Sequence, residues 1–322
     1  MKFVFIDQDY RLNVSDGDGI VKRLKEFGDV EFYDDEPCSQ DVLYERGKGA
    51  DVIFFKINQF TNELIDRFAD GGVKFIQFMG IGYSNYLNVD HCVSRGIRIR
   101  GIGEYGSNSV AEYALAFILC ATRGITAADR RMKGKIWDTN GLLGMELASS
   151  TVGVIGTGAI GGLVAQKLSL LGSRVLACDI TPNSELADSF GVKYVTIETL
   201  MGESDVVTLH MKYTPETHNF ITGELLGLMK PGSFFINIAR AQIVDYEALE
   251  RLLGSGRIRG AAIDVHYGEP PADWRLALME NVTASPHMGY FTEASNTNML
   301  RLSVESVLEF VKGTADCRGL MG

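Results

Sequence analysis

The sequence is poor in the residues that build disulfide frameworks and metal sites. Its five cysteines are odd in number, scattered along the chain and free of any Cys-x-x-Cys pair, which predicts reduced thiols in a cytoplasmic protein. No His-Glu-x-x-His motif or similar cluster of ligands is present. We therefore expect neither a disulfide framework nor a bound metal.

Long apolar runs and clusters of positive charge are also missing. The apolar start of the chain, residues 1–7, is too short for a signal peptide, and the stretch at 110–121 is too short to span a bilayer and carries Glu112. The formal net charge is −10, whereas nucleic-acid binding requires a cationic face that neutralises phosphates. These absences predict that neither a membrane nor a nucleic acid is a partner.

What the chain does contain is a regular alternation of short apolar strands and helical segments. Its length of 322 residues suggests about two domains. Strands are expected at 2–6, 30–33, 51–55, 74–78 and 97–100, and again at 151–155, 174–178, 205–209, 233–238, 260–265 and 281–284. Strands that alternate with helices predict parallel sheets covered on both faces. We therefore predict an α/β fold of two doubly wound parallel-sheet (Rossmann/flavodoxin-like) domains with a cleft between them.

The segments between and after the two sets of strands suggest where the chain crosses between domains. A glycine-rich passage at 101–106 is the expected first crossing, and a single long helix is expected over 107–133. Residues 134–149 have no clear period and form either a surface loop or an arm that contacts another subunit. A last helix, at about 293–312, has apolar residues at helical spacing, so we expect it to pack on the N-terminal domain.

The most informative motif is a glycine turn, Gly156-Thr-Gly158-Ala-Ile-Gly161, between a predicted strand and a predicted helix. Gly156 permits a tight turn, Gly158 lets the backbone approach a pyrophosphate, and Gly161 lets the helix pack closely. The helix N-terminus offers N–H groups to phosphates. Asp179, at the end of the following strand, is placed to bind a ribose. The alternative is an ordinary strand–turn–helix corner, but the combined context favours dinucleotide binding.

This motif assigns roles to the two predicted domains. Residues 103–290 contain the glycine turn and are predicted to be the dinucleotide-binding domain, whereas residues 1–102 with 291–322 are predicted to be the substrate domain.

Three polar residues follow predicted strands downstream of the glycine turn. Arg240, Glu269 and His287 each come just after a strand, and side chains beyond the carboxyl ends of parallel strands can meet in one crevice. Taken singly, each has a simpler interpretation: a surface charge, a turn residue and a loop histidine.

Several motifs in the same order resemble the D-isomer-specific 2-hydroxyacid dehydrogenase family. They are the glycine turn, the segment 210–217 (HMKYTPET), the run 229–240 (MKPGSFFINIAR), the run 260–264 (GAAID), Gly268-Glu-Pro270 and Pro286-His287. Residues 105–112 (YGSNSVAE) are similar to the Tyr-Ser-Pro-Asn-Ala-Ile-Ala-Glu pattern of the D-lactate and D-2-hydroxyisocaproate branch. The resemblance extends over nearly the whole chain.

The resemblance implies an NAD-dependent oxidoreductase with Arg240, Glu269 and His287 as its catalytic residues. A planar guanidinium can bridge the carboxylate and carbonyl of a 2-keto acid with two hydrogen bonds. The His287 imidazolium can protonate the carbonyl oxygen during reduction, and its neutral form can take the hydroxyl proton in reverse. Glu269 would fix the tautomer of the ring. Reduction should then decline, and oxidation rise, as pH increases and the imidazolium is lost.

The same resemblance implies a set of cofactor-binding positions. They are Gly156, Gly158, Ala159, Ile160, Gly161, Asp179, His210, Met211, Lys212, Thr217, Ile238, Ala239, Arg240, Asp264 and His287. Asp179 should accept hydrogen bonds from ribose hydroxyls and repel a 2′-phosphate, and residues 180–182 (ITP) supply no compensating cation. NAD is therefore expected in preference to NADP.

The family pattern also implies substrate-binding positions, namely Gly80, Ile81, Gly82, Tyr105, Arg240, His287 and Tyr290. Three departures bear on them. The loop at 82–88 has one residue more than the family pattern, which places Asn88 at an aspartate position; Lys212 replaces a proline; and Ala241-Gln242 replaces a common Gly-Gly. The first departure puts D-lactate itself in doubt as the substrate, and the other two concern cofactor affinity.

Alternatives to a D-lactate or D-2-hydroxyisocaproate dehydrogenase remain open. One is an NAD(H)-sensing binding protein on the same fold, similar to the C-terminal-binding corepressors. Another is a family member that acts on glycerate and hydroxypyruvate, or on phosphite. A formate dehydrogenase is disfavoured because Glu269 stands where those enzymes have glutamine, and a phosphoglycerate dehydrogenase with a regulatory tail because the chain stops soon after its last helix. The resemblance also implies a homodimer that uses residues 107–149.

Overall fold

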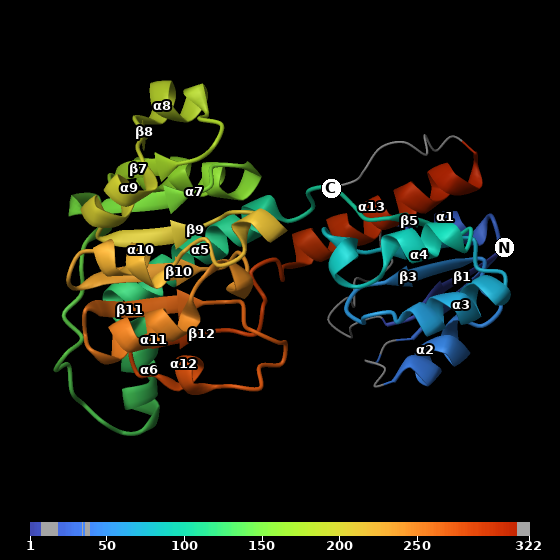
Figure 1. Ribbon diagram of the computed structural model, residues 1–322, viewed down its shortest axis with the longest axis horizontal. Helices are drawn as coiled ribbons and strands as arrows, with labels where there is room; N and C mark the ends of the chain where they lie inside the picture. The colour runs from blue at the N-terminus through green and yellow to red at the C-terminus, as the bar shows by residue number, and fades with distance from the viewer. Residues whose placement is uncertain (8–18, 34, 36–38, 314–322) are drawn as a thin grey trace. The chain divides into compact units, whose positions relative to one another are not determined.

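The computed structural model describes residues 1–7, 19–33, 35 and 39–313 of the chain. They form two compact units, one containing Met1–Gly106 and the chain from Thr292 onward, the other Ser107–Phe291 (Figure 1). The chain therefore passes from the first unit to the second and back. Each unit is built on its own parallel sheet, which confirms the predicted fold class.

The first unit has a five-stranded sheet in the order β2-β1-β3-β4-β5, with every neighbouring pair parallel. The order reverses between β1 and β3, which is the switch point of a flavodoxin-like sheet. Each strand lies within one or two residues of its predicted position. The strands are β1 (Lys2–Phe5), β2 (Asp29–Phe32), β3 (Val52–Phe55), β4 (Phe75–Phe78) and β5 (Arg98–Arg100).

Helices cover both faces of this sheet because alternate side chains along a strand point to opposite faces. Ile53 and Phe55 pack in a cluster with apolar residues of α2, α3 and α4. On β4, Phe75 packs on Phe310 of α13, with ring centroids 4.5 Å apart, and α1 also contacts α13. The helices are α1 (Lys22–Lys25), α2 (Gln40–Gly47), α3 (Asn62–Asp70), α4 (Val89–Ser94) and α13 (Glu293–Val311).

The second unit has a seven-stranded sheet in the order β12-β11-β10-β9-β6-β7-β8, again with parallel neighbours. The six strands β6 to β11 follow the order of a dinucleotide-binding sheet, and β12 adds a seventh strand beside β11. The short β8 was not predicted, because two residues carry no alternation that a sequence pattern could reveal. The strands are β6 (Thr151–Ile155), β7 (Arg174–Cys178), β8 (Lys193–Tyr194), β9 (Val206–Leu209), β10 (Ser233–Asn237), β11 (Ile258–Ile263) and β12 (Val282–Ala284).

The central strands of the second sheet, β6, β9 and β10, are buried along their whole length, because helices cover both faces of the sheet. Val152 and Val154 of β6 share a cluster with α5 and α7, whereas Ile155 and its neighbours on β9 and β10 share another with α9, α10 and α11. The helices are α5 (Ser107–Arg123), α6 (Ile125–Lys133), α7 (Ala159–Leu170), α8 (Ser184–Phe190), α9 (Ile197–Glu203), α10 (Gly223–Leu228), α11 (Tyr246–Gly254) and α12 (Arg275–Leu278).

The single long helix predicted over 107–133 is wrong. The helix breaks at Gly124, whose φ of +62° is left-handed, a conformation that ends an α-helix and that glycine adopts at little cost. Helices α5 and α6 are bent by 66° at this break. Within the described ranges no single helix is long and apolar enough to cross a membrane; only this bent pair reaches that length and composition.

Candidate active site

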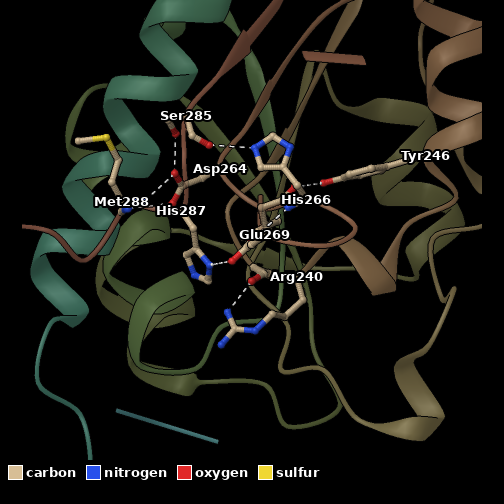
Figure 2. Close-up of polar contacts among 11 residues, drawn as sticks. Arg240, Tyr246, Asp264, His266, Glu269, Ser285, His287 and Met288 are labelled. Carbon is tan, nitrogen blue, oxygen red and sulfur yellow. Dashed lines mark hydrogen bonds and ion pairs between the residues drawn. The ribbon is translucent and has the colours of Figure 1, made fainter. Parts of the chain in front are cut away.

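The three predicted catalytic residues follow the carboxyl ends of three neighbouring strands. Arg240 follows β10, Glu269 follows β11 and His287 follows β12, and these strands are adjacent in the second sheet. Parallel strands end at one edge, so the loops after them collect their side chains there. Figure 2 shows the guanidinium of Arg240 near the Glu269–His287 pair.

Glu269 and His287 form an ion pair. The Nδ1 atom of the His287 ring lies 2.7 Å from Oε2 of Glu269, and the other carboxylate oxygen, Oε1, accepts the His266 N–H at 3.3 Å. Burial opposes ionisation of Glu269, but the hydrogen bond and charge of His287, the His266 N–H and the charge of Arg240 outweigh it and lower the pKa of the carboxyl. An ionised Glu269 favours the form of the His287 ring that carries a proton on Nδ1.

Asp264 holds the backbone that carries His287. The φ of His287 is +49°, which is uncommon for a residue with a side chain and costs energy unless its surroundings fix it. The His287 N–H donates to the carbonyl of Asp264 at 2.8 Å, and the buried Asp264 carboxylate accepts the N–H groups of Met288 and Gly289, each at 2.8 Å. Ser285 donates its hydroxyl to the same carboxylate at 2.5 Å. Asp264 is thus an anchor of the histidine loop.

Arg240 projects from a turn fixed by the last residue of β10. Asn237, which is fully buried, donates from Nδ2 to the Arg240 carbonyl at 3.1 Å and accepts the Ala239 N–H at 3.0 Å. The Arg240 guanidinium donates through Nη1 to the carbonyl of Ala239 at 2.7 Å. Ile238 and Ala239, both predicted as cofactor-binding positions, are 7% and 9% exposed and separate the sheet from Arg240.

The glycine turn between β6 and α7 has the shape that the motif predicts. Gly156 has φ +87°, and a Cβ there would stand 2.9 Å from the His210 carbonyl oxygen. A Cβ at Gly161 would stand 1.9 Å from the carbonyl oxygen of Gly156. At Gly158, by contrast, a Cβ would meet nothing within 4 Å, which leaves open space before the first turn of α7, where Ala159 and Ile160 lie. The turn therefore fits a pyrophosphate at a helix N-terminus.

Asp179 is tied to this turn. Its Oδ2 accepts the Thr157 N–H at 2.6 Å and the Thr157 hydroxyl at 3.1 Å, and its Oδ1 accepts the Thr181 N–H at 2.9 Å. Partial burial raises the pKa of Asp179, but these hydrogen bonds outweigh it and the net pKa is lowered. The carboxylate is ionised and keeps lone pairs for ribose hydroxyls, and Ile180 beside it is fully exposed.

The end of β9 supplies the remaining predicted cofactor positions. The His210 side chain is half-buried with its Nδ1 atom out of contact with solvent, and this loss of solvation lowers its pKa to about 3, so it is neutral; its Nε2 lies 2.9 Å from the Thr208 hydroxyl. Met211 is half-buried against the core, and Lys212 is exposed. The Thr217 hydroxyl donates to the Lys212 carbonyl at 3.0 Å, which closes the loop that follows β9.

The predicted substrate positions belong to both units. In the first unit, Gly80 is buried, Gly82 has φ +86°, and Ile81 between them is 48% exposed. Tyr105 is half-buried, and its carbonyl accepts a bond from Asn298 at 3.4 Å. In the second unit, Tyr290 stands edge-on to the His287 ring with centroids 6.4 Å apart.

Asn88, at the end of the altered loop at 82–88, is the N-cap of the helix that follows. Asn88 caps α4 by accepting the His91 N–H at 3.1 Å, and asparagine and aspartate serve equally well at an N-cap. The same loop contains a single turn of 3₁₀-helix at Tyr83–Asn85.

Sequence reasoning missed Asn237, Thr157 and Ser285, which position Arg240, Asp179 and Asp264. A buried asparagine at the end of an apolar strand was a usable signal for the first, whereas hydroxyl residues beside a glycine turn or a proline are too common to stand out.

Among the residues that the structure describes, no group of three or more His, Cys, Asp or Glu could hold a metal ion. Cys92, Cys120 and Cys178 are free thiols, while Cys38 and Cys317 lie outside the described residues.

Comparison with known proteins gives this geometry a family context. Residues 115–289 match the family model described as "D-isomer specific 2-hydroxyacid dehydrogenase, NAD binding domain". The D-3-phosphoglycerate dehydrogenase of Methanocaldococcus jannaschii is 33% identical over 91% of this chain and 55% of its own length. The glyoxylate reductase of Thermococcus onnurineus is 30% identical over 91% of this chain and 90% of its own. The chain thus spans about half the length of the first relative and nearly all of the second.

A solved structure agrees over the whole chain. The pyruvate reductase of Chlamydomonas reinhardtii is 28% identical, covers 100% of this chain and 98% of its own, and superposes with a TM-score of 0.87. The three proteins differ in the substrates that their names give.

Proposed function

This chain belongs to the D-isomer specific 2-hydroxyacid dehydrogenase family, whose NAD-binding domain is its second unit, and we propose that it is an NAD-dependent D-2-hydroxyacid dehydrogenase. In this proposal it transfers hydride reversibly and stereospecifically between NADH and a small 2-keto acid of the pyruvate or 2-ketoisocaproate type. The observation that carries the proposal is the Glu269–His287 ion pair of 2.7 Å beside Arg240, at the same sheet edge as the glycine turn.

The residues divide the chemistry among them. Arg240 binds the carboxylate and the carbonyl oxygen of the keto acid, because a guanidinium can donate two parallel hydrogen bonds. His287 holds a proton at Nε2 and gives it to the carbonyl oxygen, while Glu269 stabilises the imidazolium through Nδ1. Bound NADH supplies the hydride. The hydride at carbon and the proton at oxygen together convert the ketone to the hydroxyl.

Substrate contacts outside this trio are also part of the proposal. In the first unit the backbone N–H groups of Gly80–Gly82 and the hydroxyl of Tyr105 contact the substrate carboxylate. Tyr290, edge-on to His287, lines the side-chain pocket. Support for a small, unphosphorylated keto acid comes from the name of the structurally similar pyruvate reductase. The phosphoglycerate and glyoxylate enzymes among the relatives make their substrates necessary comparisons.

A panel of keto acids tests the proposal. Pyruvate, 2-ketoisocaproate, phenylpyruvate, hydroxypyruvate, glyoxylate and 3-phosphohydroxypyruvate are assayed with NADH, and we expect pyruvate or 2-ketoisocaproate to have the highest kcat/KM. Arg240→Ala should lower kcat/KM by about 10²- to 10⁴-fold, because two charge-assisted hydrogen bonds are lost. Lys230→Ala, a surface cation paired with Asp205, is the control. Negligible turnover of every acid, with NADH still bound, would favour an NAD(H)-sensing binding protein.

We also propose a homodimer that uses the 107–149 region, in the cytoplasm. Support for the dimer comes from exposed apolar side chains in this region, including Trp137 at 89%, Leu143 at 82% and Met132 at 56% exposure. Sedimentation of the wild type should give a dimer, and Trp137→Glu should shift it toward the monomer. A stable monomer at micromolar concentration would contradict this part of the proposal. The free thiols of Cys92, Cys120 and Cys178 support a reducing compartment.

A further inference from the structure

Two tyrosines tie the loop that carries Arg240 to the loop that carries Glu269. Tyr246, the first residue of α11, donates its hydroxyl to the Val265 carbonyl at 3.0 Å. Tyr267, on the loop after β11, donates in the opposite direction to the Val244 carbonyl at 3.0 Å. The two rings meet edge to face, with centroids 5.5 Å apart and planes at 85°. We refer to Tyr246 and Tyr267 together as the tyrosine clasp.

One end of the clasp reaches the backbone of Arg240. Asn237 donates from Nδ2 both to the Tyr246 hydroxyl at 2.9 Å and to the Arg240 carbonyl at 3.1 Å. The Tyr246 hydroxyl therefore accepts from Asn237 and donates to Val265. Burial raises the pKa of this hydroxyl, so it keeps the proton that the second bond requires.

The other end of the clasp reaches the catalytic ion pair. Val265 is followed by His266, whose N–H donates to Oε1 of Glu269 at 3.3 Å, and Oε2 of Glu269 contacts the His287 ring. A continuous series of short contacts thus joins the main chain at Arg240 to the imidazole, and Figure 2 shows Tyr246 beside this loop. The sheet cannot do this alone, because the pairing of β10 with β11 ends at Asn237 and Ile263.

We propose that Tyr246, supported by Tyr267, is a positioning residue that sets the place of the Arg240 guanidinium relative to the Glu269–His287 pair. The inference rests on the proposed function. In that function Arg240 must hold the carbonyl oxygen that His287 protonates, and the two side chains stand on separate loops. A misplacement of about 1 Å between such groups can cost about 100-fold in rate. The clasp extends the rigidity of the sheet beyond the last paired residues.

Tyr246→Phe is the sharpest test, because it removes one oxygen and keeps the ring in its packing. We expect kcat/KM for the best keto acid of the panel to fall by about 10- to 100-fold, with a matching loss of affinity for oxamate in the NADH complex. The Kd for NADH alone, from fluorescence titration, should stay within about threefold, since the glycine turn and Asp179 lie on other strands. Tyr267→Phe should have a smaller effect in the same direction.

Tyr33→Phe is the matched control, since it removes a tyrosine hydroxyl that donates to Glu31 at 2.6 Å in the first unit. It should leave kcat/KM unchanged. A purely structural Tyr246 would lower the melting temperature without changing kcat/KM or oxamate affinity below that temperature, and this result would overturn the inference. So would a Tyr246→Phe, Tyr267→Phe double variant whose loss equals the product of the single losses, because one clasp predicts a smaller combined effect.

The failure of this inference can be told apart from failure of the proposed function. If the wild type reduces a keto acid and Tyr246→Phe matches Tyr33→Phe, the inference alone is wrong. If the wild type reduces none of the acids, the proposed function fails and the inference falls with it.

Discussion

The edge of the second sheet at which its strands end has two halves, and they hold their ionisable groups in different ways. At the β6–β7–β9 half, Asp179 accepts three hydrogen bonds from the glycine turn and Thr181, and the half-buried His210 is neutral. At the β10–β11–β12 half, the side chains of His287 and Glu269 remain 31% and 41% exposed and pair with each other.

This difference matches two tasks. A half that holds a nucleotide benefits from groups already fixed by neighbours, because a rigid site loses little entropy on binding. A half that moves a proton needs an accessible group whose charge can change during the reaction. Two histidines at the same edge therefore have different roles, and the environment of each ring decides which.

The largest effect should come from removing the accessible histidine. His287→Gln is expected to lower kcat for keto-acid reduction by about 10²- to 10⁴-fold, the usual contribution of a general acid, while the Kd for NADH changes little. His91→Gln, which alters a contact of 2.9 Å between the ring Nε2 and the Asp66 carboxylate in the first unit, is the control. Steady-state kinetics with less than a tenfold loss would place proton transfer elsewhere.

The partner of that histidine should give the next largest effect. Glu269→Gln keeps a hydrogen-bond acceptor but loses the charge that stabilises the imidazolium, so reduction near neutral pH should fall by about 10- to 100-fold. The decline in rate with rising pH should also begin at a lower pH. In the wild type the lowered pKa of Glu269 keeps the carboxylate ionised across this range. An unchanged profile of kcat/KM against pH would contradict the pairing.

His210 should affect the stability of the fold rather than the chemistry. Its pKa of about 3 lies below the unfolded value of about 6.5. The unfolded chain therefore binds a proton that the folded one does not, and stability is lost as pH falls below about 6.5. Between pH 7.5 and pH 5, His210 should lower the free energy of unfolding by about 2 kcal/mol.

A titration with urea at each pH measures that loss. Tryptophan fluorescence is a suitable signal because Trp137 and Trp274 both belong to the second unit. His210→Gln should remove this part of the pH dependence. If the free energy of unfolding falls with pH by the same amount in the variant and in the wild type, the His210 ring is not the group responsible.

The smallest expected effect concerns cofactor choice. Asp179→Ala should lower the ratio of kcat/KM for NADH to that for NADPH by about 10-fold. The variant loses a charge-assisted hydrogen bond to the ribose of NADH and no longer repels the 2′-phosphate of NADPH. Asp188→Ala, at an exposed position on α8, controls for the change in net charge. A wild type that prefers NADPH would refute the assignment before any variant is made.

The sequence pattern was sufficient for the central strands of both sheets, because they are buried on two faces and mostly apolar, but it missed the short, partly exposed edge strand β8. It failed at Gly124, where a glycine inside a helical pattern can either continue or end the helix. It also predicted that Arg240, Glu269 and His287 would lie at one edge of the sheet, because each follows one of three neighbouring parallel strands; their catalytic roles stay a prediction. It could not identify Tyr246 or Asn237 as part of the site. Their importance comes from hydrogen bonds between loops that are distant in the chain, and no local pattern encodes these.

The last described helix has a consequence for biosynthesis. Helix α13 supplies Phe310, which packs on Phe75 of β4, and Glu309, which pairs with Arg100 at 2.9 Å. The first unit is thus begun at one end of the chain and completed by a helix more than 180 residues downstream of Gly106. On the ribosome, the second unit has all of its own strands before α13 emerges, so the first unit, which is made earlier, has the part of its sheet around Phe75 still uncovered. Chaperones are expected to bind nascent chains at this stage.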